Sequence, residues 1–318
     1  MSFGRLGERM APPFEGIIVL GTPRSGTTLM RRLLSAHPRI HCPPETHLFA
    51  AAGRFLRAEP MADGLSVGVL PGLAYAGVVE TDLLDGLRDL TFGLMRRMAD
   101  RQGKRLWAEK TSQNVFYLDE IARLCGDRCL FVVVVRHGLD VACSIKELVD
   151  RSEMVLAEIQ PYVARSARPL EAFAHVWVDT NQALERFMCA DEDRTLLVRY
   201  EDLLRDPVPA LGRLFDFLGE PVDPAAVLET FRSRVDAVGL GDWKAVLSPG
   251  LNTESVERWR GLGGDTIARL GSIANGELER LGYEAVPTTS ARAAGQARRR
   301  YEVGLMVERL HRRLDEDA

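Results

Sequence analysis

The sequence predicts an α/β fold in which a central, mostly parallel sheet is flanked by helices on both faces. Short β-branched segments alternate with longer helical patterns, and this order requires crossover connections between parallel strands. The segment CLFVVVV, residues 129–135, is apolar without alternation, as expected of a central strand that is buried on both faces. A Gly-containing loop joins the first strand to the first helix, so we expect the fold to be P-loop-like.

Each element is defined by its apolar pattern. The expected strands are residues 16–20, 105–108, 129–135 and 195–199. The expected helices are residues 27–36, 81–100, 114–124, 139–150, 170–190 and 208–218, with further helical stretches at 253–260 and 265–281. Glycines between residues 59 and 76 predict a loop over a cleft.

The chain length suits one large domain with a small appendage. The 318 residues are 46% apolar, which is enough for a sizeable core. We expect a flexible N-terminus at 1–15, one folded domain at 16–283, and a linker with a charged helix at 284–318. Val303 and Met306 fall on one side of that helix. This favours a surface helix, or one that packs in a homodimer, over an arm that reaches a partner.

Charge and cysteine content exclude several classes of protein. A net charge of −4 gives no general attraction to nucleic acid or to anionic membranes. The five cysteines are odd in number and include no C-x-x-C pair, which argues against a disulfide framework or a metal site and for a reducing compartment. No segment resembles a signal peptide or is apolar enough to span a bilayer. We therefore expect a soluble, cytoplasmic protein.

The loop GTPRSGTT, residues 21–28, predicts an anion site. Its two glycines have the spacing of the triphosphate loop G-x-x-x-x-G-K-[ST], but the lysine is missing and Arg24 lies inside the loop. Unpaired N–H groups and the helix dipole favour an anion at the start of the following helix. Gly21 and Gly26 permit close approach, Thr27 and Thr28 add hydroxyl groups, and Arg24 supplies a fixed charge.

A second anion position is indicated where the strand 129–135 ends. A triphosphatase commonly holds Mg²⁺ with a carboxylate at such a place. Here the next residue is Arg136, followed by His137 and Gly138. The reversed charge argues against a metal-bound triphosphate and for direct binding of an anion.

These segments resemble the sulfotransferases that use 3′-phosphoadenosine-5′-phosphosulfate (PAPS). TPRSGTT is similar to the family's 5′-phosphosulfate loop, VVRHGLDVACS to its 3′-phosphate site, and GDWK, more weakly, to a loop that covers the cofactor. LLVRYEDLLRDP is similar to the segment after the cofactor strand. The resemblance implies PAPS as the donor, PAP as the product, and a set of cofactor-binding residues: Pro23, Arg24, Ser25, Gly26, Thr27, Thr28, Arg136, Ser144, Tyr200, Trp243, Lys244 and Arg258.

Within the family, the chain is most similar to the tyrosylprotein sulfotransferase branch, through PRSGTTLMRRLLSAHPRIHCPPETHLF. This similarity implies that Glu45 is the catalytic base, that Lys110 is the catalytic lysine, and that Arg24 takes part in catalysis. The branch is secretory, anchored and disulfide-bonded, whereas this chain shows no anchor and LWAEKTSQN has no cysteine near Lys110. The resemblance thus implies the mechanism more strongly than it implies a protein tyrosine as substrate.

The expected reaction is transfer of a sulfuryl group to a hydroxyl of a small molecule or a peptide tyrosine. A positioned base such as Glu45 contributes ~10²–10⁴-fold, and we expect burial to raise its pKa. His47 and then His41 are the competing bases. Lys110 and Arg24 would stabilise the charge that develops on the bridging oxygen. The alternative for Lys110 is a surface ion pair with its neighbour Glu109.

Two other functions remain open at this stage. One is a P-loop nucleotide kinase or hydrolase, which would need Mg²⁺ and ATP or GTP. The other is a catalytically inactive PAP-binding protein. Trp107 and Trp243 could stack on adenine or lie in the core. We expect residues 48–76 and 147–170 to form the pocket for the sulfuryl acceptor.

Overall fold

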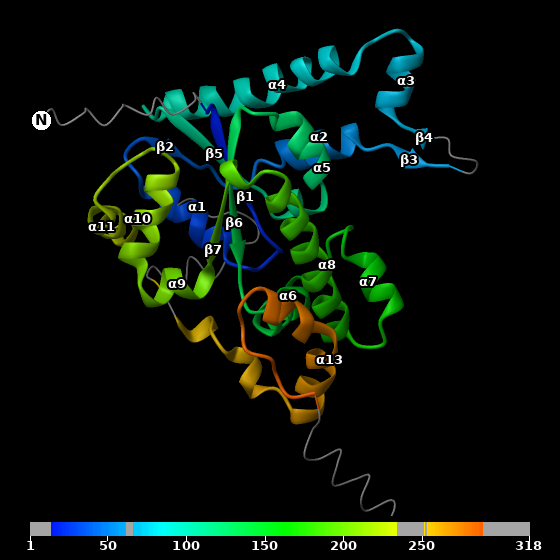
Figure 1. Ribbon diagram of the computed structural model, residues 1–318, viewed down its shortest axis with the longest axis vertical. Coiled ribbons are helices and arrows are strands. Elements are labelled where there is room, and N and C mark those ends of the chain that lie inside the picture. The colour runs from blue at the N-terminus through cyan, green and yellow to red at the C-terminus, as the bar shows by residue number, and fades with distance from the viewer. Residues whose placement is uncertain (1–13, 62–65, 234–250, 252, 289–318) are drawn as a thin grey trace, which may run out of the picture. The chain divides into compact units, whose positions relative to one another are not determined.

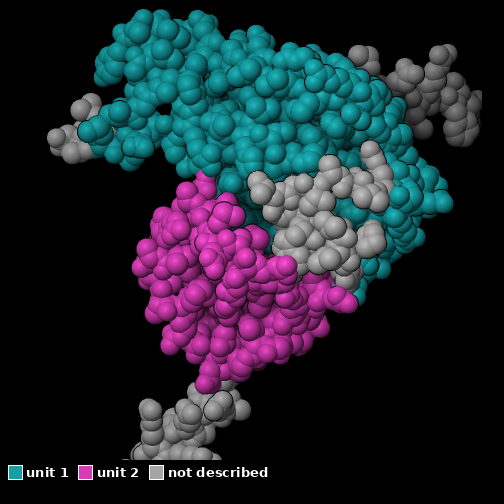
Figure 2. All heavy atoms as spheres, turned by 180° about the vertical axis from the view of Figure 1, so that it is seen from behind, with its two compact units in different colours: residues 1–136, 179–253 teal, residues 137–178, 254–318 magenta. Residues whose placement is uncertain are grey.

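The computed structural model describes residues 14–61, 66–233, 251 and 253–288 (Figure 1). The chain divides into two compact units, coloured in Figure 2. The first unit holds residues 1–136 and 179–253, and the second holds residues 137–178 and 254–318. The expected termini at 1–15 and 284–318 lie largely outside the described residues. Among the helices that are described, none combines the length and the apolar character that crossing a membrane requires.

A five-stranded sheet forms the centre of the first unit. Its strand order is β2-β5-β1-β6-β7, and every neighbouring pair runs parallel. The strands are β1 Gly16–Leu20, β2 Ile40–His41, β5 Leu106–Lys110, β6 Cys129–Val135 and β7 Thr195–Arg199. All residues of β1, β5 and β6 are buried, because helices cover both faces. The predicted α/β fold with a parallel central sheet is confirmed.

One face of the sheet packs against four helices of the first unit: α1 Thr27–Ala36, α9 Tyr200–Arg205, α10 Pro207–Phe217 and α11 Pro224–Ser233. Alternate strand residues, such as Val19 of β1 and Val132 of β6, face this layer. They meet Leu33 of α1 and Leu214 of α10 in one continuous core. Full burial of each such side chain contributes about 1.5–3 kcal/mol.

The opposite face packs against another set of helices: α2 Leu48–Leu56, α4 Glu80–Arg101, α5 Leu118–Cys125 and the later part of α8 Pro169–Ala190 (Figure 1). Here Trp107 of β5 contacts Phe49 and Phe92, with ring centroids 5.8 and 5.2 Å away. Phe187 of α8 meets Phe131 of β6 edge-on at 4.8 Å. Trp107 is therefore a core residue and not an adenine platform.

Several short elements differ from the sequence prediction. Residues 59–76 contain a hairpin and a helix instead of a loop, namely β3 Glu59–Pro60, β4 Ser66–Val67 and α3 Val69–Tyr75. The helix expected at 114–124 is divided into the 3₁₀ turn η2 Ser112–Phe116 and α5. Another 3₁₀ turn, η3 Glu192–Arg194, precedes β7. The division at Tyr117 follows from the polar contacts of η2, because Ser112 and Asn114 bond side chains of neighbouring segments.

The second unit is helical in its described residues. Its elements are α6 Gly138–Ser152, α7 Gln160–Arg165, the beginning of α8, the 3₁₀ turn η5 Arg258–Gly261 and α13 Gly264–Arg280, with η4 Thr253–Ser255 at the boundary of the units. Asp140 of α6 accepts hydrogen bonds from the backbone N–H groups of Glu257 and Trp259. His137 stacks on Trp259 at 5.2 Å. These contacts hold η5 against α6.

Candidate active site

The candidate site lies at the carboxyl ends of β1, β5 and β6. Parallel register places Val19 beside Lys110 and Leu20 beside Val133, so the three strands end at one edge. The chain continues to one side of β1 through β2 and β5 and to the other through β6 and β7. Open α/β sheets bind ligands where the strand order reverses in this way.

Glycine is required in the loop between β1 and α1. Gly26 has a φ of 103°, and a Cβ built there would lie 2.2 Å from Cδ2 of Tyr200. Arg24 also adopts a left-handed conformation, with a φ of 75°. A non-glycine residue held at positive φ is uncommon, and such strain is concentrated at ligand sites. Glycine at position 26 therefore allows both this backbone conformation and the close packing of the Tyr200 ring.

Buried hydrogen bonds hold this loop in place. The hydroxyl groups of Thr22 and Thr180 lie 2.6 Å apart, and Asn181 Nδ2 donates to Thr22 Oγ1 at 3.1 Å. Ser25 Oγ donates to the carbonyl of Val134 in β6 at 3.0 Å. The hydroxyl of Ser25, a predicted cofactor-binding residue, thus ties the loop to the sheet. Pro23 and Thr27 are buried in the same loop.

Three predicted cofactor-binding residues meet beside the loop. Arg136 directly follows β6 and is only 4% exposed. Its Nη1 donates to the carbonyl of Arg24 at 3.2 Å, and its guanidinium lies 4.7 Å over the ring of Tyr200. The tyrosine ring in turn packs against Gly26. A buried cation is thereby held at the edge of the loop.

Lys110 is the last residue of β5 and is buried, with 2% exposure. It shares a strand face with Ala108, which belongs to the core under α1. Its Nζ donates to Glu45 Oε1 at 2.6 Å and to Thr28 Oγ1 at 3.1 Å. The alternative of a surface ion pair with Glu109 is therefore wrong.

Glu45 receives three kinds of support. Besides Lys110, the backbone N–H of Ser112 donates to Oε1 at 3.1 Å, and the hydroxyl of Ser112 donates to the same oxygen. Burial pushes the pKa of Glu45 up, but the charge of Lys110 and these hydrogen bonds outweigh burial, so the pKa is lowered. The expectation of a raised pKa was wrong, because the sequence did not show which cation reaches the carboxylate.

Ser112 was missed by the sequence analysis. Its only signal is its position, two residues after the lysine that ends β5. A serine in a 3₁₀ turn has many ordinary uses, so the pattern alone could not select it. The structure shows that both its donors meet one carboxylate oxygen.

The two competing histidines occupy different places. His47 precedes α2 with a φ of 58°, is exposed, and donates its backbone N–H to Thr111 Oγ1 at 3.1 Å. No hydrogen bond from the described residues orients its ring. His41 lies in β2, paired with Trp107. Among the three candidate bases, Glu45 is the one whose carboxylate is hydrogen-bonded to Lys110.

Two of the remaining predicted residues, Ser144 and Arg258, belong to the second unit. Ser144 is buried in α6. Arg258 forms an ion pair with Glu147, which is also in the second unit, at 2.7 Å. The joint phosphate site of Arg136 and Ser144 stays a prediction. Trp243 and Lys244 lie outside the described residues.

The chain belongs to the sulfotransferase family. The family model described as "Sulfotransferase family" matches residues 16–224, which include the loop, Glu45, Lys110 and Arg136. The resemblance recognised in the sequence is confirmed.

Two curated relatives illustrate the similarity. The nodulation protein NoeE of Sinorhizobium fredii is 27% identical over 257 residues, covering 76% of this chain and 59% of that protein. The protein-tyrosine sulfotransferase of Drosophila melanogaster is 24% identical over 285 residues, covering 84% and 51%. The chain thus spans between half and two thirds of the length of these relatives. The similarity to a protein-tyrosine sulfotransferase is consistent with the resemblance to the tyrosylprotein sulfotransferase branch.

Solved structures show the same fold. The sulfotransferase domain of the curacin biosynthetic pathway matches with a TM-score of 0.58 and 21% identity, covering 86% of this chain and 99% of that domain. The sulfotransferase domain of the Synechococcus PCC 7002 olefin synthase matches with a TM-score of 0.56 and 23% identity, covering 86% and 96%.

Proposed function

We propose that the chain is a PAPS-dependent sulfotransferase that moves a sulfuryl group to an acceptor hydroxyl, with Glu45 as the general base. One observation carries the proposal. Lys110 Nζ lies within hydrogen-bond distance of both Glu45 Oε1, at 2.6 Å, and Thr28 Oγ1, at 3.1 Å. A buried cation therefore stands between a carboxylate and the start of the anion-binding helix. Family membership supports this chemistry.

The residues of the loop fit a phosphosulfate donor. Backbone N–H groups at the start of α1 and the helix dipole favour an anion there, and the positive φ of Gly26 shapes the loop that precedes them. Arg24 and Arg136 would supply fixed positive charge. PAPS would bring an activated sulfuryl group and leave as PAP.

The chain's own residues would act as follows. Glu45 accepts the proton of the acceptor hydroxyl while the acceptor oxygen bonds to sulfur and the bond from sulfur to the phosphate oxygen breaks. Lys110 and Arg24 stabilise the negative charge on the departing oxygen. The leaving electron pair remains on PAP, so no oxidant or reductant is required. His47 is the second candidate for the base that accepts this proton.

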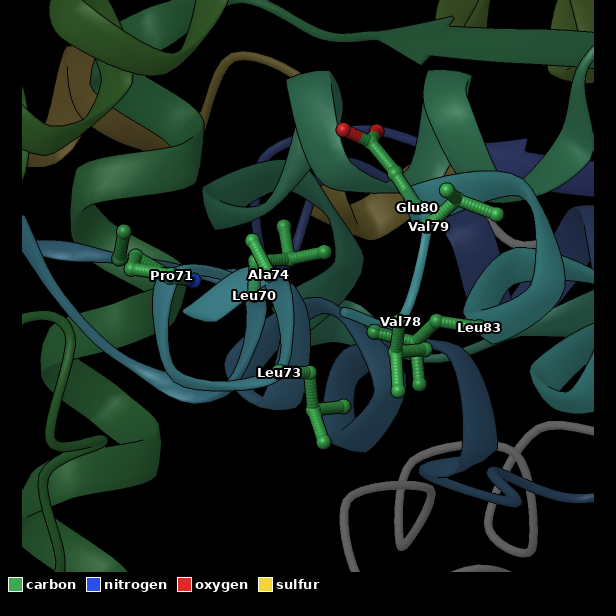
Figure 3. Close-up of a pocket in the computed structure, with 9 residues that line it drawn as sticks. Leu70, Pro71, Leu73, Ala74, Val78, Val79, Glu80 and Leu83 are labelled. Atoms are coloured by element: carbon green, nitrogen blue, oxygen red, sulfur yellow. The ribbon is translucent and has the colours of Figure 1, made fainter. Parts of the chain in front are cut away.

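Residues 48–76 are proposed to contribute to the acceptor-binding surface, and the expected contribution of residues 147–170 stays a prediction. This segment contributes to an apolar hollow of about 260 Å³ between α3 and the start of α4, where residues 48–76 end (Figure 3). Leu70, Leu73 and Val78 line it, and Glu80 is the one charged residue among its nine lining residues. Such a lining would suit an apolar part of the acceptor, which is either a small molecule or a peptide.

We also propose a cytoplasmic location and a homodimer. The five cysteines are free thiols, as is usual in a reducing compartment. The charged helix predicted within residues 284–318 would supply the dimer contact. Cell fractionation tests the first statement, and light scattering of the full chain beside a chain ending at residue 283 tests the second.

Donor binding and turnover test the proposed function. Calorimetric titration with PAP should show binding, and Arg136→Ala should weaken it. Mass spectrometry of acceptor libraries incubated with labelled PAPS should reveal a sulfated product. PAP binding without turnover on any acceptor would favour an inactive PAP-binding protein, and no PAP binding would overturn the proposal.

A further inference from the structure

Glu109 is a fully buried carboxylate next to the proposed catalytic lysine. It is 0% exposed and points to the opposite face of β5 from Lys110, because successive strand residues alternate. Burying an ionisable group is costly unless it is hydrogen-bonded. The proposed reaction makes no direct use of Glu109, so its burial requires another explanation.

Glu109 has three hydrogen-bond partners among the described residues, and each of them donates to it. Thr46 Oγ1 and Thr111 Oγ1 donate to Oε1 at 3.0 and 2.5 Å, and Asn114 Nδ2 donates to Oε2 at 2.7 Å. A carboxylate only accepts hydrogen bonds, so it fixes the direction of both threonine hydroxyl groups. Their lone pairs remain available to backbone N–H groups.

Those N–H groups belong to the segment that carries the proposed base. Thr111 Oγ1 accepts from the N–H of His47 at 3.1 Å, and Thr46 Oγ1 accepts from the N–H of Leu48 at 3.3 Å. Residues 46–48 directly follow Glu45. The chain after the base is therefore held by hydroxyl groups that Glu109 orients.

The turn that carries the Ser112 donors to Glu45 is bonded to the same carboxylate. Ser112, which donates twice to Glu45 Oε1, is the residue after Thr111. Asn114, two residues further along η2, is bound to Glu109 Oε2. One buried carboxylate thus joins the segment that carries Glu45 to the turn that holds the carboxylate of Glu45.

We propose that Glu109 is a positioning residue, which fixes Glu45 for proton transfer by orienting the hydroxyl groups of Thr46 and Thr111. This inference rests on the proposed function, because it assigns Glu109 a part in the action of Glu45. It concerns positioning and not contact with substrate, since Glu109 is sealed from solvent on the far face of β5.

The test compares two variants that remove a threonine hydroxyl with one variant that keeps a hydrogen-bond acceptor at position 109. Thr46→Val and Thr111→Val retain side-chain shape but lose the link to Glu109. In Glu109→Gln, the amide oxygen can still accept both hydroxyl groups. Its NH₂ group can donate to Asn114 Oδ1, which has no hydrogen-bond partner among the described residues, once the Asn114 amide turns.

Thr91→Val is the matched control. Thr91 is a buried threonine of α4 whose hydroxyl donates within its own helix, to the carbonyl of Leu87 at 2.7 Å. The assay is consumption of labelled PAPS with water as the acceptor, with PAP affinity measured by calorimetry. Hydrogen exchange at the amides of His47 and Leu48 gives a readout that does not depend on activity.

We expect Thr46→Val and Thr111→Val each to lower kcat by ~10–100-fold, because small misplacements of a catalytic group are costly. PAP affinity should stay within about twofold of wild type, since both hydroxyl groups bond Glu109 and the segment after Glu45 rather than the donor loop. Exchange should rise at His47 in Thr111→Val and at Leu48 in Thr46→Val. Glu109→Gln should retain most of the turnover, and Thr91→Val should change none of these values.

Suppose that the wild-type chain binds PAP and turns over, and that both valine variants turn over as fast as Thr91→Val. That result would overturn the positioning role of Glu109 but not the proposed function. A wild-type chain that fails to bind PAP would overturn the proposed function, and the role of Glu109 with it. If Glu109→Leu were the only variant to lose activity and it also failed to fold, a purely structural role would be indicated.

Discussion

Lys110 and Glu45 form an ion pair at 2.6 Å in which the two partners differ sharply in exposure. The lysine side chain is 1% exposed, whereas the glutamate side chain is 21% exposed. The cation is thus fixed inside the protein and the carboxylate remains accessible to a proton donor from solvent. This asymmetry matches the parts assigned to them, a stationary charge and a base that meets the acceptor.

Replacement of the base is the first prediction. Glu45→Gln should lower kcat by ~10²–10⁴-fold, because the amide cannot accept the acceptor's proton. PAP affinity should be nearly unchanged, since the loop and Arg136 remain. Labelled-PAPS turnover and calorimetry measure both quantities. A variant that binds PAP normally and turns over at the wild-type rate would contradict the assignment of Glu45.

Removal of the buried cation is the second prediction. Lys110→Met should lower kcat by ~10²–10³-fold through loss of electrostatic stabilisation. It should also raise the pKa of Glu45, because burial then acts without its main opposing charge. Carbon NMR titration of the Glu45 carboxyl measures that pKa. Lys146→Met, which breaks an exposed ion pair with Asp150, is the control and should change neither value.

Loss of the Ser112 hydroxyl is the third prediction. This hydroxyl lowers the pKa of Glu45, so Ser112→Ala should raise it. The acid limb of kcat/KM, which reports the base of the free enzyme, should move to higher pH. Ser233→Ala removes an exposed helix serine and should leave the limb in place. A downward shift in Ser112→Ala would show that the hydroxyl does not stabilise the carboxylate.

A methyl group in the loop gives the fourth prediction. Gly26→Ala combines a positive φ with a contact of 2.2 Å to the Tyr200 ring, so it should weaken PAP binding and lower the melting temperature. Such backbone strain costs about 1–3 kcal/mol before any displacement of Tyr200. Gly72→Ala in α3 is the control, because nothing lies within 4 Å of the added methyl group. Equal PAP affinity in the two variants would argue against this loop as the donor site.

The buried carboxylate of β5 gives a fifth prediction, on stability and pH. Burial raises the pKa of Glu109 above its ordinary value of 4.5. A raised carboxyl pKa stabilises the fold at pH below the ordinary value, and this contribution is lost as pH rises through the folded-state pKa. Glutamine does not titrate, so Glu109→Gln does not lose this contribution. The free energy of unfolding of Glu109→Gln, relative to that of wild type, should therefore increase as pH rises. Urea unfolding from about pH 4 to 8 measures this, and a constant difference would refute it.

The main strands and the longer helices could be predicted because their apolar patterns are long enough to be distinctive. β6 is one example, with seven consecutive buried residues. β2 is two residues long and α9 is six, so neither shows a usable period. β5 extends to Lys110, beyond its expected end at residue 108, because Glu109 and Lys110 are buried through partners elsewhere in the chain.

The same distinction between local and long-range information applies to the residues of the candidate site. The loop could be predicted because its residues are contiguous and their backbone requirements are local. The pairing of Lys110 with Glu45, the donors of Ser112 and the network of Glu109 depend on contacts across more than sixty residues of sequence. No local pattern in a single sequence contains that information.

The strand order β2-β5-β1-β6-β7 also constrains how the protein folds. Lys110, Arg136 and Tyr200 reach the loop at residues 21–28 only after β5 and β6 have paired with β1 and β7 has paired with β6. Parallel pairings of this kind close long loops, and such non-local contacts form slowly. A nascent chain would therefore display the loop early but acquire the assembled site late, when residues near position 200 have left the ribosome. Capture of the donor would then report completed folding of the sheet.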